Sequence, residues 1–215
     1  NTVHHLHTRD CSVQRKNQKV IEEGPATVAP EEQLQQMCAD ACRFGEAVGL
    51  RGLATAEFLY DPESKKYYFL EVNPRLQVEH VITEMMFGGL NLPSLLVDLC
   101  CGQCSRQMLS DLCEQRPTQH VVSIRVCAED MQQNFQPSTG RIERIEYNPA
   151  TSHEWGYFSI VRGKMTGRAD NQFGHLFAKG GNRECAIDRL INSIRRLTIL
   201  SECTHTCKTL RQVLS

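Results

Sequence analysis

The sequence predicts an α+β protein in two parts. Segments with helical spacing of apolar residues are mixed with short runs rich in β-branched and aromatic residues, which are typical of strands. A polar stretch without a strong period, residues 102–119, is predicted to be the linker or domain edge between the parts. The chain has 215 residues, which is enough for one large domain or two modest ones with their own cores.

The first part is predicted to hold a helix, a β-hairpin and a second helix. Glu31 and Glu32 after Pro30 suit a helix N-terminus, and apolar residues then recur at helical spacing. Two extended segments joined by a turn-forming stretch predict the hairpin. The expected elements are a helix at 31–48, strands at 53–60 and 66–72, a polar loop at 73–80 and a helix at 91–101.

The second part is predicted to begin with an apolar strand and to end with an amphipathic helix. Ala186, Leu190, Ile194 and Leu197 would share one face of that helix. The expected elements are strands at 121–126, 141–147 and 157–161 and a helix at 182–197.

Composition excludes several classes of partner. The net charge of −1 gives no field for nucleic acid or an anionic membrane. No apolar run approaches the roughly 20 residues of a membrane helix. The first ten residues are polar and carry three histidines, so they are not a signal peptide, and the absence of an initiator Met fits an excised segment or a processed terminus.

Eleven cysteines could form either a metal site or a set of reduced thiols. Cys101 and Cys104 have the two-residue gap of zinc sites, but a second matching pair is missing. We therefore favour reduced structural thiols in a reducing compartment.

The densest group of functional side chains runs from Glu71 to His80. Glu71 and Asn73 are two residues apart and point to the same side of an extended chain, and Glu57 could join them across the hairpin. Such oxygen ligands suit Mg²⁺ or Mn²⁺ with nucleotide phosphates. Spacing alone slightly favours the alternative of two surface acids on neighbouring strands.

The same stretch predicts an anion site. The planar fork of Arg75 matches a carboxylate, carbonate or phosphate, and Gln77 and Glu79 alternate behind it. A carboxylate beside bicarbonate could take its proton. The alternative is an Arg–Glu surface pair of little energetic consequence. Upstream, the basic run at 9–25 would by itself be interpreted as a solvated, charged loop, with a phosphate-contacting loop as the alternative.

Two long motifs resemble those of biotin carboxylases. Residues 9–25 are similar to the family signature RDCS-x-QRR-x-QK-x-x-EE-x-P, and residues 71–85 to E-x-N-x-R-x-QVEH-x-x-TEM. The resemblance continues through 124–130 and 137–140 and covers nearly the whole chain. Shorter strings, at 155–159 and 169–175, resemble eukaryotic-type acetyl-CoA carboxylases.

This resemblance implies the C-terminal half of an ATP-grasp domain, residues 1–105, followed by a biotin carboxylase C-terminal domain, residues 106–215. The implied enzyme is a ligase that uses ATP and bicarbonate to form carboxyphosphate, which carboxylates biotin. This is the first half-reaction of acetyl-CoA carboxylase, on the route to malonyl-CoA for fatty acid biosynthesis.

By resemblance, Glu57 and Glu71 would hold two divalent metals, Mg²⁺ or Mn²⁺, on the ATP phosphates, with Asn73 close by. Gln14 and Lys19 would lie near the phosphates and bicarbonate.

The resemblance also assigns the carboxylation chemistry. Arg75, Gln77 and Val78 would hold bicarbonate, and Glu79 would be its general base. Arg125 would stabilise the charge that develops on the biotin enolate.

The sequence departs from the family pattern at three positions: Asn17 replaces a usual His, Gly24 a common Ala, and Val81 a common Pro. The preceding half of the domain, with its Gly-rich lid, has no match here, so this segment is expected to be inactive alone.

The resemblance implies a biotin carboxyl carrier and a carboxyltransferase in the same chain, a homodimeric parent and a cytoplasmic location, with an organelle as the alternative. The other hypotheses are a carboxylase for another acyl-CoA, pyruvate or urea, and a non-catalytic regulatory or dimerisation module. Trp155 and Phe173 are expected to be core residues. By resemblance, their alternative is a surface that binds macrocyclic inhibitors and a phosphopeptide.

Overall fold

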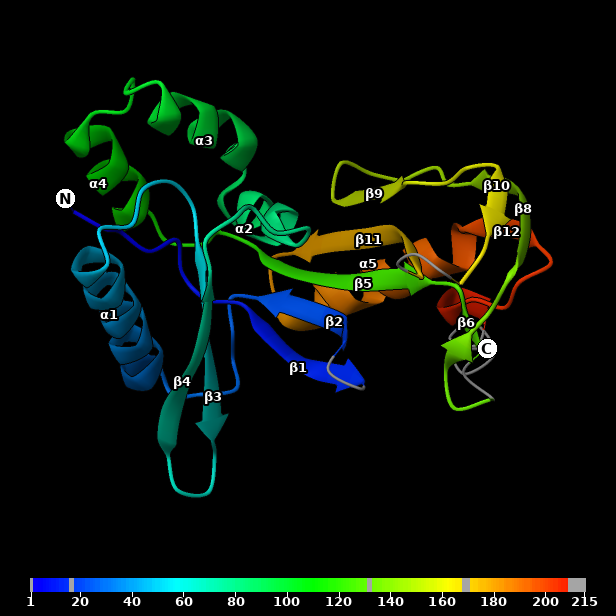
Figure 1. Cartoon of the computed structure of the whole chain (residues 1–215), viewed down its shortest axis with the longest axis horizontal. Helices are drawn as coiled ribbons and strands as arrows, with labels where there is room; N and C mark the ends of the chain where they lie inside the picture. Colours follow the sequence, from blue (N-terminus) through cyan, green and yellow to red (C-terminus); the bar gives the residue numbers. More distant parts are fainter. Residues whose placement is uncertain (1, 16–17, 131–132, 168–170, 209–215) are drawn as a thin grey trace. The chain divides into compact units, whose positions relative to one another are not determined.

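The computed structural model describes residues 2–15, 18–130, 133–167 and 171–208, which form two compact units (Figure 1). Unit 1 comprises residues 1–10 and 23–119, and unit 2 comprises residues 11–22 and 120–215. The α+β class is confirmed, because both units mix helices with antiparallel strands. The predicted boundary between residues 105 and 106 concerns the two family domains and stays a prediction.

Unit 1 contains the predicted helix, hairpin and second helix. Its elements are α1 (Glu31–Ala47), β3 (Thr55–Asp61), β4 (Lys66–Asn73), α2 (His80–Phe87), α3 (Leu92–Cys100) and α4 (Arg106–Glu114). The expected helices at 31–48 and 91–101 and the hairpin are therefore confirmed to within about two residues. Asn91 caps α3 by accepting a hydrogen bond from the backbone N–H of Ser94.

The stretch at 102–119, predicted as a linker or domain edge, does end at the boundary between the two units, after residue 119. It is not an irregular linker, however, because half of it is helix α4. Ser105 caps this helix by accepting a hydrogen bond from the backbone N–H of Met108 at 3.0 Å. Leu109, Leu112 and Cys113 then recur at helical spacing. The helical period was obscured because polar residues fill the remaining positions.

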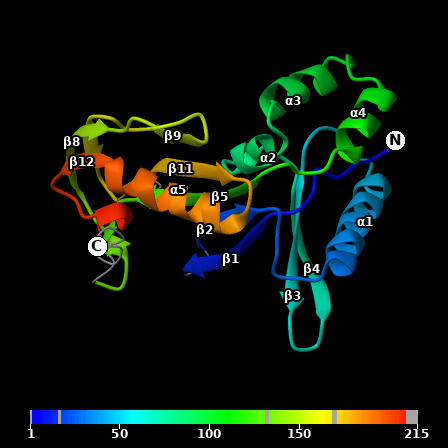
Figure 2. The ribbon, with the colours of Figure 1, turned by 180° about the vertical axis from the view of Figure 1, so that it is seen from behind.

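Aromatic side chains pack α1 against the hairpin, and both ribbon views draw the two side by side (Figures 1 and 2). The rings of Phe44 and Phe69 lie 5.2 Å apart. Tyr67 donates a hydrogen bond from its hydroxyl to Asp40 at 2.8 Å, and this bond is the main reason that the pKa of Asp40 is lowered. The hairpin is therefore held on one side by a helix.

Unit 2 is built on a five-stranded sheet in the order β1-β2-β5-β11-β9. These strands are β1 (Asp10–Arg15), β2 (Gln18–Gly24), β5 (His120–Cys127), β11 (Gln172–Gly180) and β9 (Glu154–Phe158). The interpretation of residues 9–25 as a loop is thus wrong, since most of that run forms the two strands at one edge of this sheet. Residues 18–24 alternate little in polarity, and the alternation of residues 10–15 rests on only two apolar positions, Cys11 and Val13, so the pairing of these strands could not be predicted locally.

The remaining elements of unit 2 complete a smaller sheet and a covering helix. They are β6 (Glu129–Asp130), β7 (Gln136–Pro137), β8 (Gly140–Glu146), β10 (Gly163–Met165), α5 (Arg183–Arg196) and β12 (Thr198–Ser201). Strands β10, β8 and β12 form a three-stranded sheet, and β6 pairs with β7. The predicted strands near 121–126 and 141–147 and the helix at 182–197 are confirmed, whereas the strand expected at 157–161 begins earlier, at Glu154.

Helix α5 covers one face of the five-stranded sheet, as Figure 2 shows from behind. Ala186, Leu190, Ile194 and Leu197 are all at most 5% exposed, as their spacing predicted. They pack in one core with strand residues such as Ile124 and with the partly buried Ile21 of β2. Asn182 caps α5 through the backbone N–H of Cys185.

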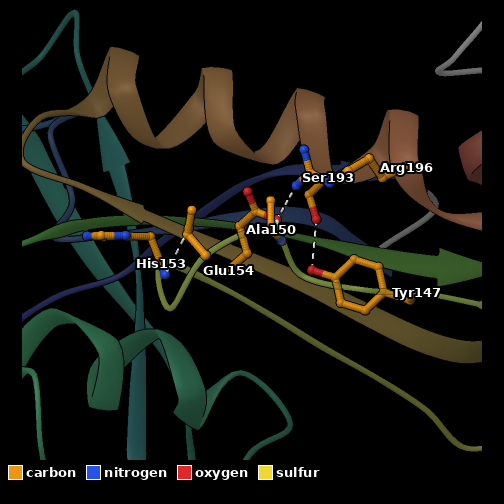
Figure 3. Close-up of polar contacts among 7 residues, drawn as sticks. Tyr147, Ala150, His153, Glu154, Ser193 and Arg196 are labelled. Carbon is orange, nitrogen blue, oxygen red and sulfur yellow. Dashed lines mark hydrogen bonds and ion pairs between the residues drawn. The ribbon is translucent and has the colours of Figure 1, made fainter.

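Two polar contacts tie the segment before and within β9 to α5 (Figure 3). Tyr147 and Ser193 share a hydrogen bond between their hydroxyls at 2.8 Å. Arg196 forms an ion pair with Glu154, which also accepts a hydrogen bond from the backbone N–H of Ala150 at 3.3 Å. The Glu154 side chain is only 4% exposed, so this carboxylate depends on the two partners. Burial is the main cause that raises the pKa of Tyr147.

The core prediction for the two aromatic residues of unit 2 is half right. Phe173 is 1% exposed and belongs to the core, whereas Trp155 is 43% exposed and lies beside Tyr157 and Phe177.

All eleven cysteines lie in the described part of the chain, and none forms a disulfide. Burial is the main cause that raises the pKa of Cys38 and Cys113 to about 11 each. In the described part of the chain, every helix is too short or too polar to cross a membrane.

Candidate active site

The three predicted metal ligands of unit 1 converge on one face of the hairpin. Glu57 on β3 is the direct cross-strand partner of Glu71 on β4, and Thr55 is the partner of Asn73. Residues two apart on a strand share a face, so both carboxylates and the amide lie on the same side. Asn73 donates from Nδ2 to Glu71 Oε1 at 2.8 Å and to Glu57 Oε1 at 3.4 Å.

A β-bulge follows this group on the hairpin. The register shifts between Glu57 and Phe58, so that Phe58 pairs with Phe69 and Leu70 is the extra residue of β4. Bulges bend a strand and re-aim the side chains beside them, and they are frequent next to functional sites. The bulge therefore lies immediately beside the two carboxylates.

The donor set of the hairpin fits a hard divalent cation. Two carboxylates and an amide within hydrogen-bond reach supply the oxygen ligands that Mg²⁺ and Mn²⁺ prefer. Among the described residues no group of three or more His, Cys, Asp or Glu side chains is arranged to hold a metal ion. Two carboxylates alone leave positions that nucleotide phosphates could fill.

The loop after β4 presents its four predicted residues in two ways. Arg75 and Val78 are exposed, and Arg75 donates to the backbone carbonyl of Leu76 at 3.2 Å. Gln77 and Glu79 are buried, with 8% and 3% of their surface exposed. The loop therefore offers an accessible guanidinium on one side and a buried amide and carboxylate on the other.

Helix α2 fixes Glu79, because this residue is the N-cap position of the helix. Its backbone carbonyl accepts a hydrogen bond from the N–H of Ile82 at 3.0 Å, and its side chain makes no capping bond. The Glu79 carboxylate therefore does not cap α2, although acidic residues at the N-cap position usually do so. Val81, in the position of a common Pro, is buried in the first turn of α2, which begins at His80.

Arg9 contacts this loop and was missed as a site residue by sequence reasoning. Its guanidinium donates to Gln77 Oε1 at 2.8 Å and to Thr83 Oγ1 at 3.1 Å. The sequence offered one indication of a role for Arg9, namely that it is the first residue of the motif at 9–25. The rest of that motif forms mainly strands of unit 2.

Unit 2 has a pocket of about 150 Å³ that brings together two of its predicted residues, Lys19 and Arg125. Arg15 adds a third cation, and Glu129 is an acid in the lining. The lining residues are Arg15, Gln18, Lys19, Val20, Arg125, Cys127, Glu129, Phe135, Pro137, Asn171 and Thr206. Three cations against one acid suit an anionic ligand.

Thr206 supports the backbone on both sides of Arg125. Its hydroxyl donates to the carbonyl of Arg125 and accepts from the backbone N–H of Cys127, each at 3.2 Å. Thr206 is 3% exposed and follows strand β12, far from β5 in sequence. No local pattern could have predicted this contact.

Arg15 is fixed at the edge of the pocket. Its guanidinium lies 3.2 Å from the ring centroid of Phe135, and Nη2 donates to the backbone oxygen and Oδ1 of Asn134 at 2.5 and 2.6 Å. Asn134 and Phe135 both have φ of 56°, in the left-handed region that non-glycine residues seldom adopt. The Arg15 guanidinium therefore stabilises the strained turn at Asn134 and Phe135, beside the pocket.

The structure does not bring Gln14 into this pocket. Gln14 is exposed on β1 and donates to the backbone carbonyl of Cys11 at 2.9 Å. Asn17, in the position of the usual His, lies outside the described residues. At Gly24, a Cβ atom would lie 2.8 Å from Met86 Sδ and 2.9 Å from Ile82 Cγ2, so the common Ala would need these side chains to shift.

Comparison with known proteins divides the chain between two domain families. Residues 1–104 match the family described as "Carbamoyl-phosphate synthase L chain, ATP binding domain". Residues 123–215 match "Biotin carboxylase C-terminal domain". The two matches follow one another in the order that the sequence motifs predicted.

Two curated relatives are named acetyl-CoA carboxylases. The mitochondrial enzyme of Saccharomyces cerevisiae is 39% identical over 217 residues, which cover 92% of this chain and 9% of that protein. Acetyl-CoA carboxylase 1 of Oryza sativa subsp. japonica is 36% identical over 227 residues, 92% of this chain and 10% of that protein. The chain thus spans about a tenth of the length of these relatives.

Solved structures of other carboxylases have the same fold. Urea carboxylase of Kluyveromyces lactis has a TM-score of 0.87 and 30% identity, over 100% of this chain and 18% of that one. The biotin carboxylase domain of Hydrogenobacter thermophilus 2-oxoglutarate carboxylase has a TM-score of 0.87 and 29% identity, over 97% of this chain and 45% of that one. That structure is a complex with MgADP, ADP and bicarbonate.

Proposed function

Because the chain belongs to the biotin carboxylase family, we propose that it takes part in the ATP- and bicarbonate-dependent carboxylation of biotin. The observation that carries this proposal is the cross-strand pair of Glu57 and Glu71, whose carboxylates both accept from Asn73. This acid pair and the buried Glu79 supply metal ligands and a base within one unit.

In this proposal Glu57, Glu71 and Asn73 hold Mg²⁺ or Mn²⁺. The bound metal would neutralise charge on the ATP phosphates, as divalent cations do in phosphoryl transfer. Asn73 already orients both carboxylates through its amide, so the ligands are preorganised before the cation binds.

The loop after β4 would bind and activate bicarbonate. The exposed guanidinium of Arg75 attracts the anion, and Gln77 and the backbone at Val78 complete its site. Glu79 then accepts the bicarbonate proton while a bicarbonate oxygen attacks the γ-phosphorus of ATP. The P–O bond to ADP breaks, and carboxyphosphate forms.

The cationic pocket of unit 2 would serve the second step, in which carboxyphosphate gives its carboxyl group to a ureido nitrogen of biotin and phosphate leaves. Arg125 would stabilise the enolate charge that develops on biotin, and Lys19 would neutralise phosphate or bicarbonate. Gln14 would also lie near these anions in the family arrangement, although its exposed position on β1 gives it no part in this pocket.

We further propose that the parent is an acetyl-CoA carboxylase that forms malonyl-CoA for fatty acid biosynthesis. The 36% and 39% identity to two acetyl-CoA carboxylases supports it, against 29% and 30% for 2-oxoglutarate and urea carboxylases. A urea-, pyruvate- or 2-oxoglutarate-type parent is the second candidate, since carboxylases of these three kinds match the fold with TM-scores of 0.85 to 0.87. Acceptor trials with acetyl-CoA, urea and each keto acid separate the two.

This chain covers only a small part of its relatives, 9% of the yeast enzyme. This supports a larger parent, with carrier and carboxyltransferase domains in the same chain. We propose a homodimeric, cytoplasmic parent, with an organelle as the alternative because one relative is mitochondrial. The segment alone should be inactive, because it matches less than half of a biotin carboxylase domain. Bicarbonate-dependent ATP hydrolysis by the isolated chain would contradict this.

The decisive experiment is ATP cleavage with free biotin as acceptor, measured with and without bicarbonate in the full-length parent. Glu79→Gln should lower the bicarbonate-dependent rate by a factor of about 10² to 10⁴, because the amide cannot accept the proton. Glu63→Gln, at an exposed hairpin turn, is the matched control and should keep the parental rate. Equal rates in all three proteins would refute the assignment of the base.

A further inference from the structure

Arg9 contacts the loop of the proposed bicarbonate site from a distant part of the sequence. Its Nη2 lies 2.8 Å from Gln77 Oε1, and its Nη1 lies 3.1 Å from Thr83 Oγ1. Gln77 is 8% exposed and Thr83 is 3% exposed, so both hydrogen bonds are made where water competes little. One guanidinium therefore connects the loop after β4 with the first turns of α2.

The chemistry of arginine decides which end of the Gln77 amide faces it. A guanidinium has five N–H donors and accepts nothing, so only the carbonyl oxygen of Gln77 can point toward Arg9. The same bond turns the Nε2 group of Gln77 away from Arg9. That group has two N–H donors and can bind only an acceptor, such as an oxygen of an anion.

We propose that Arg9 is a positioning residue that makes Gln77 a hydrogen-bond donor to bicarbonate. This inference rests on the proposed function and extends it. The Gln77 amide can present either its oxygen or its NH₂ group to the ligand, and only the NH₂ group favours an anion. Without Arg9 the amide could rotate and present its oxygen, which repels an anionic ligand.

One feature separates this role from general support of the fold. Both bonds come from the same charged donor, but the bond to Gln77 is the shorter, at 2.8 Å against 3.1 Å for the bond to Thr83. The bond to Thr83 alone would be enough to tie Arg9 to α2. Removal of each bond separately can therefore distinguish orientation of the amide from support of the helix.

The test is a double-mutant cycle on the KM for bicarbonate in the full-length parent, with ATP cleavage as the readout. Arg9→Met and Gln77→Ala should each raise this KM about tenfold, the effect of losing a charge-assisted or anion-binding hydrogen bond. The double variant should raise it no further than either single variant, because Arg9 acts through Gln77. The KM for ATP should change less than about twofold.

Three further variants keep the test decisive. Arg9→Lys retains a charge but carries its donors on one nitrogen instead of a planar fork, so its KM should lie between those of the parent and Arg9→Met. It replaces Arg9→Met in the cycle if the latter does not fold. Thr83→Val removes the other bond and should leave the KM for bicarbonate near the parental value. Arg43→Met removes an exposed arginine from α1 and controls for net charge.

The outcomes distinguish failure of the role of Arg9 from failure of the proposed function. Additive effects of Arg9 and Gln77, or an equal rise of KM in Thr83→Val, would overturn the role of Arg9 while turnover by the parent upholds the function. Absence of any bicarbonate-dependent turnover in the parent would overturn both. A KM that rises only with Arg9 and Gln77, without additivity, supports the proposal.

Discussion

The two units hold their functional groups by different means. In unit 1 the acids and the amide are oriented by other side chains, as Asn73 orients Glu71 and Arg9 orients Gln77. In unit 2, Arg125 lies on the central strand of a five-stranded sheet, and Thr206 bonds the backbone beside it. Side-chain bonds can be exchanged for bonds to a ligand, whereas a sheet keeps its geometry whether or not a ligand is present. Unit 1 should therefore respond to ligands, and unit 2 should resist change.

The largest expected effect comes from the ion pair that ties β9 to α5 in unit 2. Arg196→Met would leave the carboxylate of Glu154, 4% exposed, with the Ala150 N–H as its remaining contact in Figure 3. We expect a loss of about 3 kcal/mol in the free energy of unfolding, measured by urea denaturation. Arg144→Met, in an exposed pair with Glu146, should cost less than about 0.5 kcal/mol. Equal losses in both variants would contradict the view that unit 2 depends on buried anchors.

A smaller effect is expected at Thr206. Thr206→Val keeps the volume but leaves the carbonyl of Arg125 and the N–H of Cys127 without their hydroxyl partner, which should cost about 1 to 2 kcal/mol. Thr206→Ser keeps the hydroxyl and should retain most of the stability. Hydrogen exchange at the Cys127 amide is the direct measurement, and unchanged protection in the Val variant would show that the sheet alone holds Arg125.

The smallest effect on stability is expected from the acid pair of unit 1. Glu71→Gln should change the free energy of unfolding by less than about 0.5 kcal/mol, since Glu71 is exposed and faces a like charge on Glu57. The same variant should abolish the rise in Tm that Mg²⁺ gives the parent, because a ligand of the folded state stabilises it. Glu46→Gln on α1 is the control. A Mg²⁺ effect that survives in Glu71→Gln would break the contrast between a responsive and a rigid unit.

Much of the fold could be predicted where local signals are strong. The helix after Pro30 and the final helix were found because their apolar residues repeat over several turns. Helix α4 and strands β1 and β2 were missed, because their stability comes from partners elsewhere in the chain rather than from their own pattern. Strand β11 was also missed, although six of its nine residues in succession are buried, because a fully buried strand shows no alternation.

The site was predictable to the extent that its residues lie in one continuous motif. Glu71, Asn73 and Glu79 could be selected because polar groups crowd a short stretch after an apolar strand. Arg9 and Thr206 could not, since each acts on a residue more than sixty positions away and neither stands out in composition. The orientation of such groups depends on tertiary contacts, which no spacing rule contains.

The early strands of unit 2 have a consequence for the synthesis of the chain. The carbonyl of Glu22 on β2 accepts a hydrogen bond from Ser123 on β5, 101 positions later, and all of unit 1 after residue 23 is encoded between them. At about 5 to 20 residues per second, the ribosome would take about 5 to 20 seconds to deliver the partner strand. During that interval β1 and β2 form a nascent sheet edge without its neighbour, so unit 1 can fold first and chaperone binding should concentrate on residues 10–24.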